Sequence, residues 1–374
     1  MIKVLHSCDL NLGAEMLYPQ AVCDRLSQAQ LSVLDTILDL ATEHGVDLLV
    51  FTGNLFAHHA PEEALREAVI HRFKALPAAI RLVVLAGCYD QPLGPDSIYH
   101  HADFSPWFVD SARANGSPLN VKDGHCPVWL YTLPWQCDAG DGALGFMQRN
   151  REKGIHLGAF HSHKLKHRPN PYQDPLAHWT KAITSWQLDY VMVGNRRAGQ
   201  LSNDDGQPIA DCPGAPQGLS FQEPAQRYCS LVELGEAQTT CQALPCQHLR
   251  FEQCNLVLDG HGAEEKLHKI LSEKASDELA LQLKLHGDIE ELFDVEAIAQ
   301  RHRDEFVFLT MVDETHFLNS DYMTQMAQEE TVRGILCRRL VEMAVDAGEN
   351  QRAVYERAVR ELLHRFHAVA GEAE

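Results

Sequence analysis

Residues 84–90, which read VLAGCYD, are the stretch from which the fold of this chain is best inferred. The apolar residues predict a buried strand, and Gly87 predicts a short turn directly after it. The same pattern recurs at residues 7–13 (SCDLNLG) and at residues 51–57 (FTGNLFA). Such turns are where we expect metal-binding side chains, and most of those side chains are missing. The pattern therefore predicts the scaffold of a metal site without its full set of ligands.

The composition is that of an ordinary globular protein. With 374 residues, of which 45% are hydrophobic and 22% charged, the chain can form one large domain and one or two small ones. No apolar run approaches the roughly 18 residues of a membrane span, so we expect no membrane insertion. The 11 cysteines include no CxxC pair, and the first residues lack a secretory signal. Reduced thiols and a cytoplasmic location are therefore predicted.

The charge balance is strongly acidic, with a formal net charge of -20 from 32 Lys and Arg against 52 Asp and Glu. Because DNA binding draws much of its affinity from phosphate neutralisation, this balance argues against a broad nucleic-acid surface. Two local basic clusters could contact DNA or could be solvated loop charges. They are Lys164, Lys166, His167 and Arg168 in one loop, and Arg196 and Arg197 in another.

Residues 1–236 alternate predicted strands with predicted helices, which indicates a layered α/β domain. Helices are predicted at residues 24–44, where apolar residues recur at helical spacing, and at residues 62–76. The strands are predicted at residues 2–7, 48–52, 81–86, 128–133, 155–161, 190–193 and 228–234.

The remainder of the chain is predicted to contain a second module and a helical tail. Residues 237–245 are polar and predict a linker, and residues 246–316 predict a small α+β module. Residues 320–370 predict helices with apolar stripes, one of which contains Leu336 and Met343. Two interpretations of these stripes stay open, namely packing on the module before them and docking of a partner protein. The elements of the module are predicted as strands 249–258, 278–286 and 305–313 and helices 263–275 and 289–302.

Five stretches of the chain resemble the calcineurin-like metallophosphoesterases of the SbcD type, which are nuclease subunits of SbcCD-like DNA repair complexes, and their YhaO-like relatives. The resemblance covers about residues 1–235. It implies a four-layer metallophosphoesterase β-sandwich flanked by helices, followed by an α+β capping module and C-terminal helices. The stretches are VLHSCDLNLG at 4–13, VDLLVFTGNLF at 46–56, LAGCYD at 85–90, LDYVMVGNRR at 188–197 and PGAPQGLSFQE at 213–223.

Position by position, the resemblance implies a metal site that has lost most of its ligands. Only Asp9 and His161 keep the residue type of the family. Neutral Asn54 stands at the position of the bridging aspartate, and Tyr89 stands at the position of the catalytic histidine. Asp90, the usual orienting partner of that histidine, is kept. The implied ligand positions are Asp9, Asn11, Asn54, Cys88, His161, Asn195 and Arg197.

Two divalent metal ions need anionic ligands, and this set of residues offers few of them. We therefore expect that the site does not hold two metal ions and that it contains no catalytic residue and no cofactor. Arg197 would add a positive charge near an ion, at a cost on the order of several kcal/mol in a poorly solvated cleft. We therefore expect its guanidinium to occupy the metal position and to pair with Asp9. The alternative is one weak Mn²⁺ site held by Asp9 and His161.

Replacement chemistry is a further possibility that the sequence leaves open. Three groups of histidines could hold a metal ion at another place, although chance neighbours are common among 21 histidines. Cys88 could act as a nucleophile, but a buried neutral thiol is the favoured interpretation. The histidine groups are His58 with His59, His100 with His101, and His161 with His163 and His167.

The leading functional hypothesis is a degenerate SbcD-like subunit that acts as a structural or regulatory component in DNA repair or defence. The resemblance implies an SMC-type ATPase partner of the SbcC or YhaN kind, gripped by the C-terminal helices, and a homodimer. DNA would be reached through the complex. One alternative is an active metal-dependent exonuclease or phosphoesterase with an atypical, single-metal site. Another is a regulator that binds nucleotide or phosphate through Arg196 and Arg197.

Overall fold

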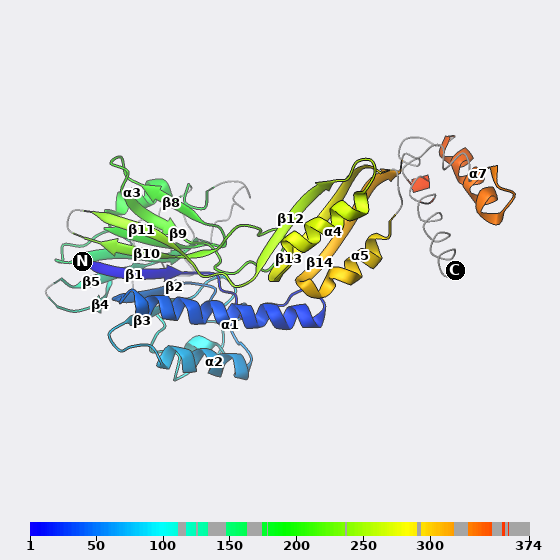
Figure 1. Ribbon diagram of the computed structural model, residues 1–374. Coiled ribbons are helices and arrows are strands. Elements are labelled where there is room, and N and C mark those ends of the chain that lie inside the picture. The colour runs from blue at the N-terminus through cyan, green and yellow to red at the C-terminus, as the bar shows by residue number, and fades with distance from the viewer. Residues whose placement is uncertain are drawn as a thin grey trace. The chain divides into compact units, whose positions relative to one another are not determined.

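The computed structural model (Figure 1) divides the chain into two compact units, Met1–Arg250 and Phe251–Glu374. The predicted division into domains at residues 1–236, 246–316 and 320–370 stays a prediction. Among the described residues, no helix combines the length and the apolar character that a membrane crossing requires. The structure describes residues 1–110, 117–124, 126–133, 147–162, 174–177, 179–235, 238–289, 293–317, 328–345, 354–355 and 358.

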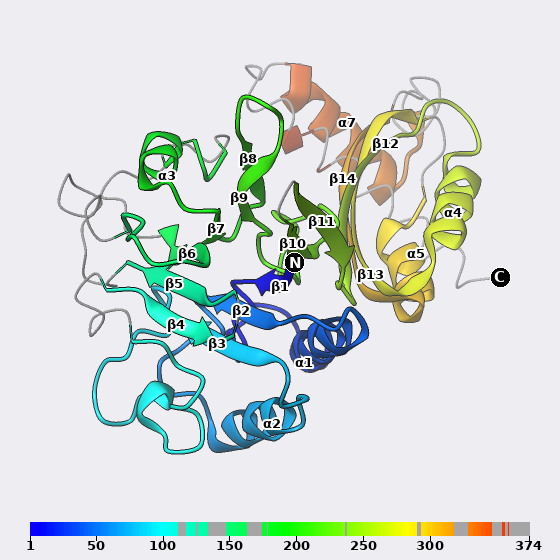
Figure 2. The same cartoon turned by 90° about the vertical axis from the view of Figure 1, so that its left-hand side faces the viewer.

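The first sheet of the first unit has five strands in the order β11-β10-β1-β2-β3 (Figure 2). Strands β1, β2 and β3 run parallel, and β10 pairs with β1 in antiparallel fashion. The three parallel strands therefore end at one edge of the sheet. The strands are β1 (Ile2–Ser7), β2 (Leu48–Thr52), β3 (Arg81–Leu85), β10 (Tyr228–Leu234) and β11 (Thr239–Pro245).

The second sheet has six strands in the order β4-β5-β6-β7-β9-β8. Its central strands β5, β6 and β7 are parallel, and β8 and β9 form an antiparallel pair at one side. The strands are β4 (Leu119–Lys122), β5 (Val128–Thr132), β6 (Ile155–His161), β7 (Tyr190–Gly194), β8 (Gly199–Ser202) and β9 (Pro208–Cys212).

The two sheets face each other, and helices cover their outer faces. Alternation along β1 sends Val4 into the cluster between the sheets and Leu5 toward the helices α1 (Gln20–Glu43) and α2 (Glu63–Lys74). On the other side, α3 (Thr180–Trp186) packs against the second sheet. This arrangement is a four-layer α/β fold, and it confirms the fold class that the sequence predicts.

Hydrogen bonds among three buried polar side chains connect the two sheets. The ring of His6 in β1 lies 3.1 Å from both carboxylate oxygens of Asp211 in β9, measured from its Nδ1. Its Nε2 lies 2.8 Å from the hydroxyl of Thr52 in β2. All three residues are buried, so each bond satisfies polar groups that would otherwise destabilise the core.

The predicted linker at residues 237–245 is wrong, because Thr239–Pro245 forms strand β11. It pairs in antiparallel register along β10, from Leu234 opposite Thr239 to Tyr228 opposite Pro245. β11 lies at the end of the sheet, so most of its side chains stay at least partly exposed and its sequence can be polar. Because its sequence is polar, a prediction based on apolar runs does not identify this strand.

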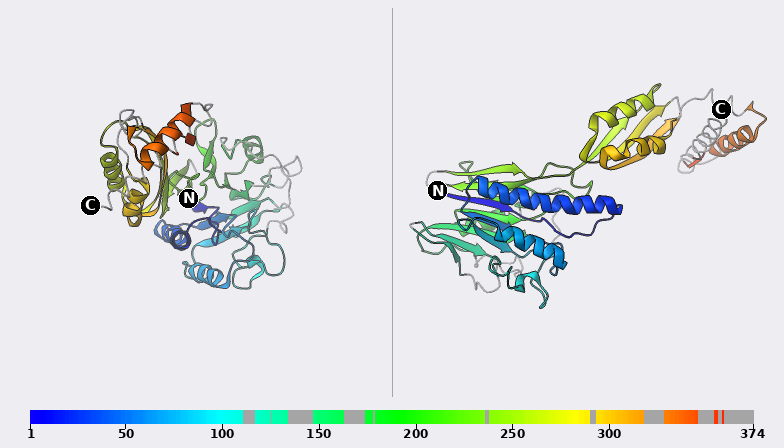
Figure 3. Two further views of the ribbon diagram at one scale, coloured as in Figure 1. Left: turned by 90° about the vertical axis from the view of Figure 1, so that its right-hand side faces the viewer. Right: turned by 60° about the horizontal axis from the view of Figure 1, so that its bottom comes forward.

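The second unit contains a three-stranded sheet in the order β12-β13-β14, in which β13 and β14 are parallel (Figure 3). Leu281, Leu283 and Leu285 of β13 are fully buried in its core with residues of the two helices. The predicted helix 289–302 begins later, at Val295, since Ile289 is still part of β13. The elements are β12 (Arg250–Val257), α4 (Ala263–Lys274), β13 (Ser276–Ile289), α5 (Val295–His302) and β14 (Phe306–Phe317).

The helical tail is described in part, chiefly by α7 (Val332–Val345). Two apolar residues of the predicted stripe, Leu336 and Met343, are 38% and 41% exposed. Val332 and Ile335 are more exposed still, at 69% and 54%. α7 therefore carries apolar side chains that the described residues do not cover.

Candidate functional site

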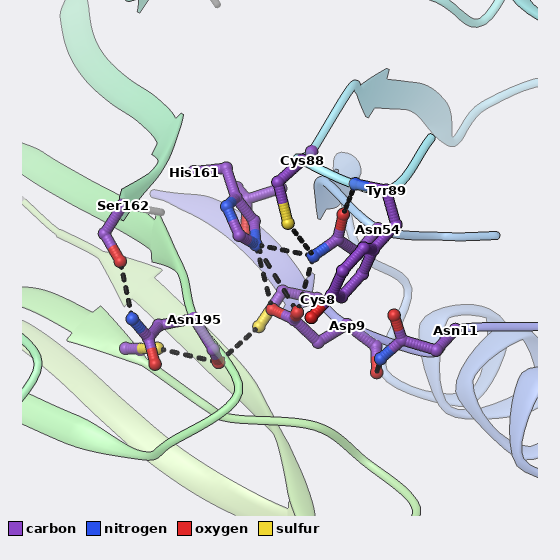
Figure 4. Close-up of polar contacts among 12 residues, drawn as sticks. Cys8, Asp9, Asn11, Asn54, Cys88, Tyr89, His161, Ser162 and Asn195 are labelled. Carbon is purple, nitrogen blue, oxygen red and sulfur yellow. Dashed lines mark hydrogen bonds and ion pairs between the residues drawn. The ribbon is translucent and has the colours of Figure 1, made fainter. Parts of the chain in front are cut away.

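The predicted ligand positions come from loops at the carboxyl ends of parallel strands. Asp9 follows β1, Asn54 follows β2 and Cys88 follows β3, while His161 is the last residue of β6 and Asn195 follows β7. In doubly wound sheets these ends form the crevice in which ligands bind. The structure brings Asp9, Asn54, Cys88 and His161 into direct contact (Figure 4).

The first two loops have an unusual backbone that main-chain bonds hold in place. Asp9, Asn11 and Asn54 adopt φ angles of 52°, 49° and 52°, a region that Asp and Asn tolerate better than most residues. The Asp9 N–H donates to the Gly53 carbonyl at 3.0 Å, and the Asn11 N–H donates to the Asn54 carbonyl at 2.9 Å. Main-chain hydrogen bonds therefore join the loop after β1 to the loop after β2.

The side chain of Asn54 is the centre of the site. Its Nδ2 donates to Asp9 Oδ1 at 2.9 Å and lies 3.1 Å from Nε2 of His161 and 3.4 Å from Sγ of Cys88. Its Oδ1 accepts the N–H of Tyr89 at 2.9 Å. The amide thus presents N–H groups to the carboxylate of Asp9.

Asp9 and His161 form a buried pair. Nε2 of His161 lies 3.2 Å from Asp9 Oδ2, and the two side chains are 4% and 3% exposed. Burial alone would raise the pKa of Asp9, but the charge and hydrogen bond of His161, with the hydrogen bond from Asn54, lower that pKa below its ordinary value. Asp9 is therefore an ionised carboxylate whose charge is balanced by protein groups.

Two glycines allow the close approach of these loops. A Cβ atom on Gly87 would lie 2.2 Å from Oδ1 of Asn54. A Cβ atom on Gly194 would lie 2.0 Å from the carbonyl of Thr52 and 2.7 Å from the ring of His161. Any larger residue at either position would push Asn54 or His161 out of contact with Asp9.

Asp90 organises the third loop. Its Oδ1 accepts the N–H groups of Gly87 at 2.7 Å and Asn54 at 3.2 Å. Its Oδ2 accepts the Phe56 N–H at 3.2 Å and the Tyr99 hydroxyl at 2.7 Å. Burial raises the pKa of Asp90 despite these four bonds. Tyr99 lies in the 3-10 helix Ile98–His100, and no sequence motif marks it as part of the site.

Cys88 gives the site little nucleophilic character. Burial raises the pKa of the Cys88 thiol to about 11, so the thiol is neutral near pH 7 and the thiolate needed for attack is scarce. The Tyr89 side chain is 49% exposed, and its ring lines a cavity beside Asn11.

Arg197 does not take the place of a metal ion, so that hypothesis is wrong. In the described part of the chain, its side chain is exposed and makes no bond to Asp9, which pairs with His161 and Asn54 instead. Its backbone N–H donates to Oδ1 of Asn195 at 3.0 Å, and Asn195 Nδ2 donates to Ser162 Oγ at 2.7 Å. The Asn195 side chain thus bonds both to the backbone of its own loop and to the residue that follows β6.

Arg196 forms a two-pronged pair with a buried carboxylate. Its Nε and Nη2 donate to the two oxygens of Glu223 at 2.6 and 2.8 Å, and Glu223 also accepts the Leu219 N–H at 3.1 Å. Burial would raise the pKa of Glu223, but the hydrogen bonds and the charge of Arg196 bring it below its ordinary value.

These residues do not fit a pair of divalent ions. Within the described residues, no group of three or more His, Cys, Asp and Glu side chains is arranged to hold a metal. Asn54 Nδ2 lies 2.9 Å from Asp9 Oδ1 and 3.1 Å from His161 Nε2, beside the atoms that an ion held by these two residues would use. His58, His59, His100 and His101 form no such group either, and His163 and His167 lie outside the described residues.

No family model matches the chain, and no curated protein matches it. Among solved structures, it is similar to the calcineurin-like phosphoesterase YfkN from Bacillus subtilis (TM-score 0.42, 11% identity, 66% of this chain and 90% of that chain). It is also similar to a dimetal phosphatase from Danio rerio (TM-score 0.36, 12% identity, 66% of this chain and 96% of that chain). A third similar structure is the protein TT1561 of Thermus thermophilus (TM-score 0.38, 11% identity, 65% of this chain and 98% of that chain). These likenesses concern the arrangement of the chain alone.

Proposed function

We propose that this chain is a catalytically degenerate relative of the SbcD-type nucleases, which acts as a structural or regulatory subunit in DNA repair or defence. The observation that carries the proposal is the amide of Asn54. It donates to Asp9 Oδ1 at 2.9 Å from the position at which the family has its bridging carboxylate. A hydrogen-bond donor at that point stabilises the negative charge of Asp9, as a cation would. The site therefore needs no ion to balance that carboxylate.

Electrostatics support this proposal over two-metal hydrolysis. A pair of divalent ions carries four positive charges, and a bridging carboxylate is the ligand that touches both. Here Asp9 is the one carboxylate within contact of Asn54 Nδ2 and His161 in the described residues, because Asp90 is directed to backbone N–H groups and Tyr99. Bringing two ions here would leave most of their charge unbalanced.

Metal content and cleavage together test the proposal. The purified chain is expected to hold less than one Mn²⁺ per molecule after dialysis against the ion. It is also expected to leave single-stranded and double-stranded DNA intact, with no difference between the wild type and Asp9→Ala. Cleavage that depends on Mn²⁺ and disappears in Asp9→Ala would overturn the proposal.

The partner and the assembly form a separate part of the proposal. Sequence resemblance points to an SMC-type ATPase partner, a homodimer and a cytoplasmic location, with DNA reached through the complex. The exposed apolar residues Val332 and Ile335 of α7 are consistent with a docking role. We expect a large coiled-coil ATPase encoded beside this chain to co-purify with it. Val332→Glu should weaken that association, and Glu342→Lys on the same helix should serve as the control.

A second candidate is a phosphoesterase with one metal ion. It is favoured by one observation, the 3.2 Å approach of Asp9 Oδ2 and His161 Nε2, which are the two retained ligand types. Calorimetric titration with Mn²⁺ separates the candidates. One ion bound per chain, lost in His161→Ala together with hydrolysis of a phosphodiester, would favour this second candidate. Absence of both would exclude it.

A further inference from the structure

Two histidines on neighbouring helices of the second unit lie in direct contact. The helices α4 and α5 lie side by side on one face of the three-stranded sheet (Figure 1). Nδ1 of His268 on α4 lies 2.8 Å from Nε2 of His302 on α5. His302 is 6% exposed, and among the described residues of the second unit no other acidic or basic side chain is as buried. The two rings therefore form a hydrogen bond between α4 and α5 that is largely shielded from water.

The contacts of the two rings determine where their protons lie. Nδ1 of His302 lies 2.9 Å from Oε2 of Glu305, and an ionised carboxylate can only accept, so this nitrogen carries an N–H. In the neutral ring Nε2 of His302 is then an acceptor, and Nδ1 of His268 donates to it. Nε2 of His268 lies 3.3 Å from Nη1 of Arg301, which can only donate. Both neutral rings therefore carry their proton on Nδ1, and the bonds run in one direction from Arg301 to Glu305.

One added proton has a place in this arrangement. Nε2 of His268 also lies 3.6 Å from Oε1 of Glu264, one turn earlier on α4. A proton on that nitrogen would exchange the bond from Arg301 for an ion pair with Glu264. The bond from His268 to His302 would stay as it is, because neither of the two nitrogens that form it changes.

A second added proton has no such place. It would have to lie on Nε2 of His302, which faces the N–H of His268 at 2.8 Å. Two N–H groups would then point at each other, and two positively charged rings would be in contact beside a buried side chain. Like charges at this distance disfavour the doubly charged form, so the bond between α4 and α5 would break.

The charged neighbours of the two rings lead to the same conclusion. They are Glu264 on α4, Arg301 on α5 and Glu305 in the 3-10 helix Arg303–Glu305. The side chains of the sheet that pack against the helices include Leu281 and Phe306, which are apolar. Two carboxylates and one guanidinium leave a single negative charge, which balances one added proton and not two.

We propose that His268 and His302 form a pH-sensitive switch, which joins α4 to α5 while it holds at most one added proton and releases them when both rings are protonated. In the unfolded chain both rings take up a proton as the pH falls below the ordinary histidine pKa of about 6.5, whereas the folded pair takes up one. The unfolded state then binds more protons, so the second unit should lose stability as the pH falls toward 5. The inference depends neither on the Asp9 site nor on the proposed function.

The direction of the hydrogen bonds is tested by NMR of the full chain, labelled with ¹⁵N in its histidine rings. After assignment of the ring signals, two-bond couplings between ring nitrogens and carbon-bound protons identify which nitrogen carries the proton. At pH 8 both His268 and His302 should be in the Nδ1–H form. An Nε2–H form of either ring at that pH would rule the proposal out, and this measurement requires no substitution.

The switch itself is tested by the pH dependence of stability. The double variant His268→Asn with His302→Gln keeps an N–H near Nδ1 and a carbonyl oxygen near Nε2, but neither side chain takes up a proton. Between pH 7 and pH 5 the melting temperature of the second unit should fall about 5 °C further in the wild type than in the double variant, as measured by scanning calorimetry. His261→Asn, at an exposed histidine of the same unit, is the control and should keep the wild-type pH dependence. The same pH dependence in the wild type and the double variant would show that the pair does not act as a switch.

Discussion

At the scale of single residues, the site is governed by how charge is balanced around Asp9. The carboxylate lies within hydrogen-bonding distance of Asn54 and His161, and its pKa is lowered although burial opposes this. Each partner is a hydrogen-bonding side chain fixed by its own loop. Replacing one of these partners by a residue of unfavourable charge should therefore lower the unfolding free energy more than replacing it by a smaller neutral residue.

The first prediction concerns Asn54→Asp, which places a second carboxylate where an amide now donates to Asp9 at 2.9 Å. Two adjacent buried carboxylates cannot both ionise easily, so we expect a loss of about 3 kcal/mol in unfolding free energy at pH 8. One pKa of the pair is raised above its unfolded value, so the loss should shrink as the pH falls toward that of the unfolded carboxyl.

Urea unfolding of the wild type and Asn54→Asp between pH 8 and pH 5 measures this effect. Asn203→Asp, on an exposed loop of the same unit, is the control and should cost less than about 0.5 kcal/mol. Equal stability of wild type and Asn54→Asp at pH 8, without added metal, would show that the pocket accepts a second charge.

The second prediction concerns Glu223, whose pKa lies below its ordinary value because Arg196 and Leu219 bond to the ionised form. Its stabilisation is fully present above the unfolded pKa of about 4.3 and is lost as the pH falls through the lower folded pKa. Arg196 is 52% exposed, so solvent screening limits the expected contribution to about 1 kcal/mol.

Glu223→Gln checks this by comparison with the wild type in urea at several pH values. The difference in unfolding free energy should be constant from pH 7 to pH 5 and should disappear toward pH 3. A difference that grows on acidification would mean that the carboxyl is bonded in its protonated form.

At the scale of elements, the sequence predicts those strands whose apolar runs are long and buried. The predicted ranges for β1, β2, β6 and β10 agree with the structure residue for residue. The short strands β4 and β8, and the edge strand β11, have polar or partly exposed residues and leave no such run. Pairing with a neighbour, which a single segment does not reveal, decides that they are strands.

The ligand positions could be predicted from the sequence in the same way, but the direction of each side chain could not. Arg197 and Asp9 follow strands of different sheets, and only the packed loops show that Arg197 is exposed while Asn54 reaches Asp9. The role of Tyr99 depends on a bond to Asp90 across nine residues of loop. Such contacts are properties of tertiary packing and carry no local pattern.

The third prediction belongs to strand β13, where neighbours alternate between the core and solvent. Leu283 is fully buried and Lys284 is exposed. Leu283→Ala should lower the unfolding free energy of the second unit by about 3 kcal/mol, whereas Lys284→Ala should change it by less than about 0.5 kcal/mol. Thermal unfolding followed by circular dichroism measures both, and similar effects of the two variants would contradict the register.

At the scale of the whole molecule, the chain has separate hydrophobic clusters in each compact unit. Leu157 belongs to the cluster between the sheets of the first unit, and Leu283 belongs to the core of the second. Since each unit has a core of its own, each is expected to unfold as a cooperative body.

The fourth prediction follows from these separate cores. Scanning calorimetry should resolve two transitions, with Leu157→Ala shifting only one of them and Leu283→Ala only the other. Shifts of a few degrees are expected for each, given the sizes of the two units. A single transition that both variants move equally would show that the units are thermodynamically coupled.

The bonds that join the loop after β1 to the loop after β2 have a consequence for engineering. They run between backbone amides of Asp9 and Asn11 and carbonyls of Gly53 and Asn54, so exchanging side chains leaves their anchors in place. A designer could graft carboxylates and imidazoles onto this framework and ask which smallest set captures a divalent ion. The chain in that sense offers a fixed backbone on which a metal site can be built one ligand at a time.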